Sequence, residues 1–443
     1  MLRLLGSRLI LGTLVGAWLL AACGGPPPTT PPPAVVTVYR AGTPTSAAKP
    51  GGTPVPIGLT PGAGGSQATP NAATAIPVYG PDAFPDNVNP LTGQVVDPAK
   101  ISRLPVAIKI SNFPYSVRPQ FGLSLADAVV EHQAEAGLTR FTAVFLQNDA
   151  AKVGSIRSAR YIDTEIAPIF GALLVTSGSS LGTMGHLRSS PWFQGAHAWR
   201  LVSEETHYGC PPLCRETPDD ANTLFANTDA LRAATAAQGG ARADLSGFAF
   251  TAAASAGGVP ATQVLIDFSL AAHVDWRYNP GGGVYERWQE KDSSGEMIAH
   301  MDALTNKPIT AASVVLLQVH HVNNFVPEDF RDGGNCGLEI QLWTIGPAKV
   351  FRDGQMFEGT WQRDQTTNWK LRVLDHAGQV IPFKPGNTWI DIVGLTAVTA
   401  LNGSTYTVTN KVPDTKTDCP IPPTETPTIT PEGFIAPTET PTP

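Results

Sequence analysis

Arginines and acidic residues gathered in the first half of the chain are the side chains best suited to chemistry. Arg157 and Arg160 stand three residues apart in the stretch GSIRSARYID, among small neighbours. A guanidinium offers a fixed fork of N–H donors that matches a carboxylate or a phosphate. The full set predicts either an anion-binding pocket or a buried network in which arginines and acids satisfy one another. It consists of Arg118, Asp127, Glu131, Glu135, Arg140, Arg157, Arg160 and Asp163.

Alternating strands and helices are predicted to position these residues. Apolar runs predict strands at 104–110, 139–147 and 172–178. The segment 125–135 is predicted as a helix, which would align Asp127, Glu131 and Glu135 in one stripe. Residues 158–171 are predicted as a second helix with Ser158 as its N-cap. Arg157 and Arg160 would then straddle a helix start, where free N–H groups favour anions.

After about residue 245 the pattern changes to short segments with period-two alternation, separated by Gly, Asn and Asp turns. Such segments are typical of a mostly antiparallel β domain. We therefore expect an α/β (α+β) N-terminal domain with a mixed sheet over 87–245. A mostly antiparallel, β-rich C-terminal domain should follow over 246–412.

Ser180 lies in GSSLG (178–182), which fits the Gly-x-Ser-x-Gly pattern of a nucleophile elbow and follows an apolar strand. The helix that should come next is a poor one, so a structural or ligand-lining loop is the favoured interpretation. A hydrolase would also need a histidine base, with His300, His320 and His321 available downstream. Adjacent residues of a strand point to opposite faces, so His320 and His321 should not line one site.

The two ends of the chain are predicted to lie outside the folded part. Residues 1–22 form a signal peptide with a cationic head and a short apolar run, which ends in Leu20-Ala21-Ala22-Cys23. This ending matches a lipobox, so Cys23 should carry the lipid (palmitate) and hold the protein on the extracytoplasmic face of the membrane. The Pro/Thr/Gly-rich segment 23–86 is predicted as a disordered tether and 413–443 as a disordered tail.

Four further cysteines fit an oxidising compartment, where disulfides persist. Cys210 and Cys214 could close a small loop, which leaves Cys336 and Cys419 as a second pair. His207 with Cys210 and Cys214 would be a zinc alternative, but it lacks an obvious fourth ligand. No metal and no cofactor are expected. With a net charge of −7 and 15% charged residues, nucleic acid is a poor candidate partner.

Several long stretches resemble the YerB-like bacterial lipoproteins, which combine a domain of unknown function with a C-terminal companion domain. They are RPQFGLSLADAVVEHQAEAGLTRFTAVF, GSIRSARYID, VFRDGQMFEGTWQR and FKPGNTWIDIV. The resemblance spans about residues 88–395 and implies a two-domain envelope lipoprotein. The resemblance matches Ser180 to a Gly-Gly-Ser-Pro loop of the family, whose proline is absent here. It matches Asn222 to a Pro-His-Asn stretch of the family, with Ala221 in place of the histidine.

Together these features predict a lipoprotein that binds an anionic or carbohydrate ligand of the cell envelope and scaffolds or regulates wall metabolism. The expected ligand-binding residues are Arg118, Asp127, Glu131, Glu135, Arg140, Arg157, Arg160, Ser180 and Asn222. Expected partners are the membrane, a wall glycan or teichoic acid, and envelope proteins. The alternatives are an envelope hydrolase that uses Ser180 or paired acids, and a protein-interaction module without a small ligand. Ligand binding requires the guanidinium groups of Arg157 and Arg160 to be partly exposed.

Overall fold

A computed structural model describes residues 76–204, 209–239, 244–253, 255–329, 334–363 and 370–416. The predictions for the signal peptide, for Cys23, for most of the tether and for the tail after residue 416 lie outside these residues, as do His207 and Cys419. Among the described helices, none is long and apolar enough to cross a membrane.

The described residues are rich in strands, form several sheets and contain few helices, which agrees with the predicted class in this coarse form. The largest sheet is 11-stranded and mixed. Its strands, in spatial order, are β11 (Val259–Pro260), β21 (Gln355–Arg363), β20 (Thr344–Arg352), β17 (Ser313–Val319), β23 (Thr388–Gly394), β3 (Ala128–Gln133), β4 (Thr139–Phe145), β2 (Val106–Ser111), β6 (Leu173–Val175) and β7 (Leu201–Val202), with β22 (Leu371–Leu374) beside β21.

A second, seven-stranded sheet is built from the C-terminal half of the chain. Its order is β15 (Met297–Ala299), β14 (Val284–Glu290), β13 (Ala272–Asn279), β12 (Gln263–Ser269), β25 (Thr405–Thr409) and β24 (Val398–Asn402), with β16 (Thr310–Ala311) beside β14. Smaller sheets pair β1 (Val78–Tyr79) with β10 (Phe250–Thr251), β18 (His321–Asp329) with β19 (Asn335–Ile340), and β5 (Val153–Gly154) with β9 (Leu224–Ala226) and β8 (Leu213–Arg215).

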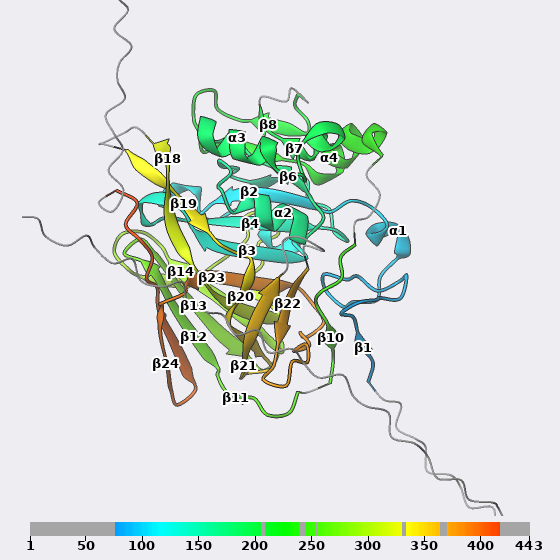
Figure 1. Ribbon diagram of the computed structural model, residues 1–443, viewed down its shortest axis with the longest axis vertical. Coiled ribbons are helices and arrows are strands. Elements are labelled where there is room, and N and C mark those ends of the chain that lie inside the picture. The colour runs from blue at the N-terminus through cyan, green and yellow to red at the C-terminus, as the bar shows by residue number, and fades with distance from the viewer. Residues whose placement is uncertain are drawn as a thin grey trace, which may run out of the picture. The chain divides into compact units, whose positions relative to one another are not determined.

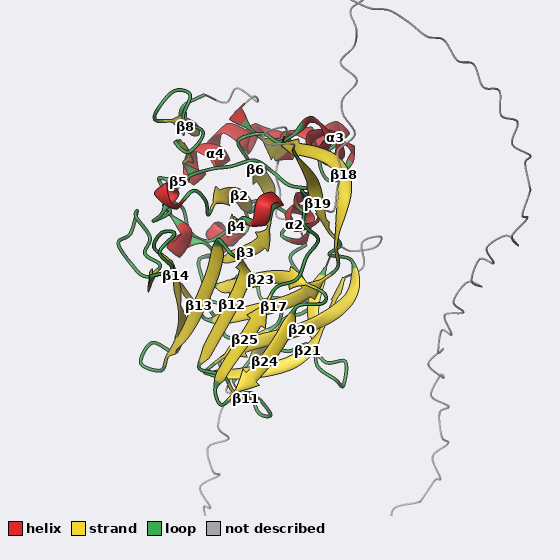
Figure 2. Ribbon diagram, turned by 90° about the vertical axis from the view of Figure 1, so that its left-hand side faces the viewer, coloured by secondary structure: helices red, strands yellow, loops and turns green. Residues whose placement is uncertain are grey.

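Helices cover the part of the large sheet that is formed by the N-terminal half of the chain. Figures 1 and 2 show α2, α3 and α4 around β2, β4 and β6, with the seven-stranded sheet at the other end. The described α-helices are α1 (Pro98–Ile101), α2 (Asp163–Ile169), α3 (Leu181–Ser189) and α4 (Thr228–Thr235).

The core lies in two layers, one on each side of the large sheet. Val129 of β3 packs with Trp276 of the seven-stranded sheet in one layer. Val130, the next residue, packs with Ile166 of α2 in the other layer. β3 is therefore buried on both faces, with all six of its residues inside.

The helix predicted over 125–135 is wrong, because Ala128–Gln133 form the central strand β3. The run AVVEHQ contains consecutive β-branched residues, which favour a strand buried on both faces. The strands predicted at 104–110, 139–147 and 172–178 correspond to β2, β4 and β6. The second predicted helix begins later than expected, with Ile162 rather than Ser158 at the N-cap position of α2.

The described fold extends slightly beyond the predicted domain limits. β1 lies inside the segment predicted as tether, and it pairs with β10. Thr415 lies inside the predicted tail, yet it is buried and its hydroxyl accepts a hydrogen bond from the amide of Ala136. The boundary near residue 245 stays a prediction, and strands from both sides of it share the large sheet through the parallel pairing of β3 with β23.

Cys210 and Cys214 form a disulfide, so their thiols are not available to the zinc arrangement considered above. Cys336 is buried and also disulfide-bonded. Its predicted pairing with Cys419 lies outside the described residues. Within the described ranges, no cluster of three or more His, Cys, Asp or Glu side chains has a metal-binding arrangement.

His320 and His321 occupy opposite environments at the junction of β17 and β18. His320 is exposed, whereas His321 is 5% exposed and its Nδ1 lies 2.8 Å from the carbonyl oxygen of Val319. Burial lowers the pKa of His321 to about 4. The folded protein therefore holds this imidazole in its neutral form at neutral pH.

Acid should destabilise the fold through His321. The unfolded chain takes up a proton near pH 6.5, while the folded protein resists until about pH 4, so stability present above pH 6.5 is lost between these values. The lowered pKa corresponds to about 3 kcal/mol of unfolding free energy. His321→Leu should flatten the pH dependence of denaturant unfolding between pH 7 and pH 4. His320→Leu is the matched control, and equal profiles for both variants would contradict this account.

Candidate functional site

The side chains of the predicted site residues on β3 lie on both faces of the large sheet. Side chains alternate along a strand, so Glu131 points with Val129 towards the seven-stranded sheet. His132 points with Val130 towards α2. The predicted cluster is therefore divided between two separate environments, with the helix-covered face containing most of the arginines.

Arg140, Arg157 and Arg160, which we call the arginine cluster, lie on the helix-covered face of the sheet. Arg140 of β4 stands opposite His132 of β3. The segment after β5 runs beside β2, with the amide of Arg157 donating to the carbonyl of Lys109. Arg160 is in the turn that leads into α2, and its guanidinium is close enough to influence the charge of Arg140.

Arg140 is a buried cation without a carboxylate partner among the described residues. Its side chain forms one hydrogen bond, from Nη1 to the carbonyl of Thr139 at 3.1 Å, and its Nε is buried without a partner. Burial and the charges of Arg160 and Arg157 lower the pKa of Arg140 to about 9. The guanidinium group of Arg140 is still protonated at pH 7. Its positive charge has no carboxylate within ion-pair distance among the described residues.

Arg160 is held by two acids from different parts of the chain. Its Nε donates to Glu135, and its Nη1 lies 3.9 Å from Glu328 of β18. Burial would lower the pKa of Arg160, but the two carboxylates raise it above its ordinary value. Burial and the charge of Glu135 raise the pKa of Glu328. Arg160 and Arg157 are both half-buried rather than enclosed.

Asn222 lies next to the arginine cluster. The carbonyl of Ala221, its neighbour, accepts a hydrogen bond from Nη1 of Arg157 at 3.3 Å. The side-chain Oδ1 of Asn222 is buried and has no hydrogen-bond partner among the described residues. Ala221 thus occupies the position next to Arg157 where the family resemblance implies a histidine.

Ser180 is the N-cap of α3 rather than an activated nucleophile. Its Oγ accepts from the amide of Thr183 at 3.1 Å and donates to Glu328 at 2.9 Å. None of the histidines in the described ranges hydrogen-bonds to this hydroxyl. His186 of the same helix stacks on Tyr161 instead, with ring centroids 4.0 Å apart. A serine nucleophile needs a base within hydrogen-bond reach, and this arrangement supplies none.

Lys109 is a buried residue of this face that the sequence analysis missed. Its Nζ lies 2.7 Å from Asp163 Oδ1, 3.0 Å from Thr142 Oγ1 and 2.6 Å from His132 Nε2. Burial lowers its pKa, although Asp163 opposes the effect. A lysine inside the apolar run LPVAIKI was the available signal, because a buried ammonium requires partners. Unlike Arg140, Lys109 is fully compensated.

Glu131 and Arg118 belong to a different network, on the face that meets the seven-stranded sheet. Glu131 accepts from Nη2 of Arg287 at 2.8 Å, and both side chains are fully buried. Arg118 donates to the carbonyl of Glu290 at 2.6 Å and lies 3.3 Å from its carboxylate. These residues therefore join the two sheets, and the prediction that they share one pocket with Arg157 and Arg160 is not met by the geometry.

Asp127 serves the backbone at the start of β3. Its carboxylate accepts from the amide of Leu146 at 2.7 Å and from the side chain of Asn89 at 2.6 Å. Asp127, Glu131 and Glu135 thus have three separate sets of partners. The hydrolase alternative with paired acids from this series finds no shared cleft in the described residues.

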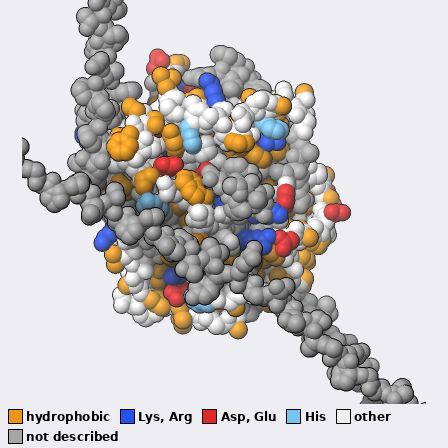
Figure 3. Space-filling model, viewed as in Figure 1, with side chains coloured by type: hydrophobic (Ala, Val, Ile, Leu, Met, Phe, Trp, Pro, Cys, Tyr) orange, Lys and Arg blue, Asp and Glu red, His pale blue; other side chains and the backbone are white. Residues whose placement is uncertain are grey.

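Charge on the visible surface is mixed. Figure 3 shows basic and acidic side chains scattered over the same face, without one large patch of a single sign. A ligand would therefore be selected by a local group such as the arginine cluster rather than by a general basic surface.

The fold is rich in strands, and the N- and C-terminal halves of the chain share one sheet. Charged residues are buried on both faces of that sheet. The "Protein of unknown function (DUF3048) N-terminal domain" matches residues 91–241, and the C-terminal domain of the same family matches residues 264–390. This chain belongs to that family.

Two comparisons with Bacillus subtilis agree with this assignment. A protein of strain 168 named "Putative lipoprotein YerB" is 27% identical over 327 residues, which are 70% of this chain and 89% of the relative. The crystal structure of the YerB protein superposes with a TM-score of 0.56 at 25% sequence identity. That match covers 69% of this chain and 96% of the other.

The two buried arginines on opposite faces should respond differently to the same substitution. Arg140→Met removes an uncompensated charge and should raise the unfolding free energy by about 1 kcal/mol. Arg287→Met leaves the buried Glu131 carboxylate without its partner and should lower it by about 3–5 kcal/mol. Denaturant unfolding at pH 7 measures both. A loss of stability in Arg140→Met as large as that in Arg287→Met would show that Arg140 is a structural residue.

Proposed function

We propose that this protein is a lipid-anchored extracytoplasmic lipoprotein that binds an anionic ligand of the cell envelope at the arginine cluster. A phosphate or carboxylate group would lie against Arg140 and the half-buried guanidinium groups of Arg157 and Arg160. A wall polymer such as a teichoic acid carries groups of this kind. Binding would serve to scaffold or regulate wall metabolism at the membrane surface.

The observation that carries this proposal is the charge balance around Arg140. A buried ionised group is costly unless it is paired. Lys109 on the same face has Asp163 at 2.7 Å, whereas the one hydrogen bond of the Arg140 side chain goes to the carbonyl of Thr139. The charge of Glu135 acts on Arg140, but burial and the charges of Arg160 and Arg157 outweigh it and lower the pKa of Arg140. An anion at this position would supply the missing counterion and several charge-assisted hydrogen bonds.

The nearest carboxylates are engaged with Arg160. Glu135 pairs with Arg160, and burial together with the charge of Glu135 raises the pKa of Glu328 above its ordinary value. The unpartnered Oδ1 of Asn222 could accept a hydrogen bond from a hydroxyl of the ligand. A glycan or polyol that carries an anionic group combines both features.

The membrane anchor rests on the sequence and on a relative. The lipobox places Cys23 as the acylated residue, and a relative over most of the chain is named as a lipoprotein. The alternative of a protein-interaction module remains a prediction.

Binding of an anionic wall fragment tests the proposal directly. The full-length chain should bind a glycerol phosphate oligomer more tightly than an uncharged N-acetylglucosamine oligomer, and added salt should weaken the binding. Arg140→Met should raise the dissociation constant about 10- to 100-fold, which is the usual effect of losing hydrogen bonds to a charged group. Isothermal titration calorimetry measures each value.

Arg277→Met is the control for loss of one positive charge. Arg277 is partly exposed on β13, pairs with Asp275 and stacks on Trp288, away from the arginine cluster. Its substitution should leave the affinity unchanged. Equal losses in the two variants, or equal binding of the charged and uncharged oligomers, would refute an anion site at Arg140.

A further inference from the structure

A cavity of about 810 Å³ lies at the opposite part of the molecule from the arginine cluster, between the edges of the two large sheets. Its walls come from β11, from β21, from the loop after β22 and from the hairpin of β24 and β25. The volume is within the range of small-molecule sites. Neither the arginine cluster nor the buried network around Glu131 contributes a residue to it.

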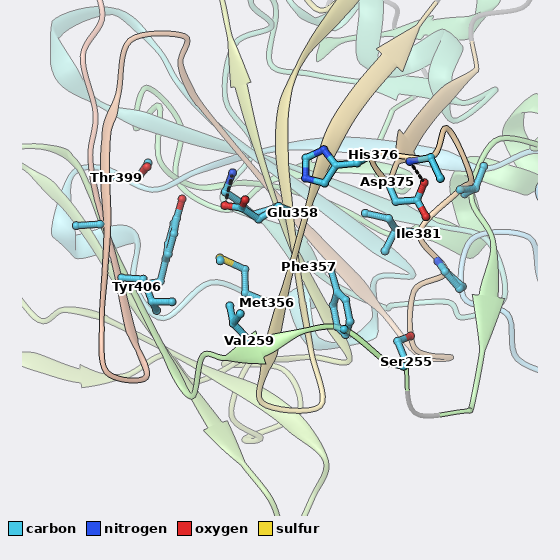
Figure 4. Close-up of a pocket in the computed structure, with 18 residues that line it drawn as sticks. Ser255, Val259, Met356, Phe357, Glu358, Asp375, His376, Ile381, Thr399 and Tyr406 are labelled. Atoms are coloured by element: carbon cyan, nitrogen blue, oxygen red, sulfur yellow. Dashed lines mark hydrogen bonds and ion pairs between the residues drawn. The ribbon is translucent and has the colours of Figure 1, made fainter.

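The middle of the cavity is apolar. Figure 4 shows Val259, Met356 and Phe357 between its two ends, with Tyr406 and Thr399 on one side and Ile381 and Asp375 on the other. Met356 is buried, while Val259 is 40% exposed at the rim. An elongated apolar ligand would remove these side chains from water without a change in the core.

One end of the cavity carries the polar side chains of Tyr406 and Thr399. Tyr406 is 3% exposed, its ring packs against Phe351 with centroids 5.3 Å apart, and the Thr399 side chain lies close enough to its buried hydroxyl to lower its pKa. Burial raises the pKa of this phenol, which therefore keeps its proton and remains a donor. A tyrosine hydroxyl is a donor as well as an acceptor, so it can donate to an acceptor atom that a ligand brings to this end.

A cation is available at the same end. Nζ of Lys349 lies 3.2 Å from the carboxylate of Glu358, whose side chain is 54% exposed. The charge of Glu358 also acts on Tyr406, and Figure 4 shows these two residues on the same side of the cavity. The Lys349 side chain itself is 14% exposed, so a carboxylate of a ligand would compete with a largely solvated Glu358 for a mostly buried cation.

We propose that this cavity binds a fatty-acyl carboxylate. The apolar chain lies along Met356 and Phe357, and the head group accepts a hydrogen bond from the Tyr406 hydroxyl. Lys349 neutralises the negative charge of the head. This site is separate from the arginine cluster, so neither proposal depends on the other.

Titration with decanoate tests the proposal. The full-length chain with Cys23→Ser, which cannot be acylated, should bind decanoate saturably with one site per chain in isothermal titration calorimetry. Methyl decanoate, which has the same chain without the charge, should bind about tenfold more weakly. Tyr406→Phe should weaken decanoate binding about 5- to 10-fold, the usual effect of one hydrogen bond.

Two matched controls separate binding from folding. Val259→Trp fills the rim of the cavity and should abolish binding, whereas Ile298→Trp, at a strand residue of β15 that is 37% exposed, should not change it. Tyr406→Phe should not lower the melting temperature. Tyr285→Phe should lower it by a few degrees, because the hydroxyl of Tyr285 donates to the carbonyl of Ala261 at 2.7 Å.

Three results would overturn the proposal. The first is the absence of saturable decanoate binding. The second is equal binding by Val259→Trp and Ile298→Trp, which would place the ligand elsewhere. The third is equal affinity for decanoate and its methyl ester, which would remove the charged head from the assignment.

Discussion

Two carboxylates lie directly opposite each other where the N- and C-terminal halves of the chain pair in the large sheet. The fold depends on the neighbouring groups that compensate their negative charge. Glu131 of β3 pairs in register with Asp391 of β23, and both are fully buried. Like charges at such positions repel. Arg287 reaches across from the seven-stranded sheet to Glu131, and the indoles of Trp276 and Trp389 donate to Asp391 at 3.1 Å. Burial and the charge of Glu131 raise the pKa of Asp391 well above its ordinary value. The second sheet is thereby tied to the first.

That arrangement constrains what the other face of β3 can do. Because the strand is buried on both sides, His132 must also be accommodated without water. Lys109 and Asp163 supply its surroundings, and burial together with the charge of Lys109 lowers the pKa of His132 well below its ordinary value. One row further along the same face, Arg140 forms no ion pair within the part of the chain that the structure describes, although the charge of Glu135 acts on it. Lys109 and Arg140 are both buried on the same face of one sheet. The difference in their partners therefore does not follow from a difference in burial.

Many of the strands and part of the site could be predicted from the sequence. The wrong helix over 125–135 and the missed Glu328 each have a physical cause. Strands β2, β4 and β6 were recognisable as apolar runs. The helix over 125–135 failed because a spacing of four residues fits one face of a strand as well as one face of a helix, and because β3 lacks the alternation of a half-exposed strand. Arg157 and Arg160 could be placed together from their local spacing. Glu328 could not, since it reaches Ser180 and Arg160 from more than 140 residues away in the chain.

Arg140 and Tyr406 differ from most of the buried polar groups in the described residues. Buried charges are paired where they hold elements together, as Arg287 and Lys109 illustrate. Isolated unpartnered atoms also occur within paired groups, such as Nε of Arg287, and these cost little because the charge itself is compensated. Arg140 differs because its side chain hydrogen-bonds only to the carbonyl of Thr139 and its Nε has no partner among the described residues, and Tyr406 differs because it lines one end of a cavity. At these two positions the proposed ligands would add partners from outside the fold.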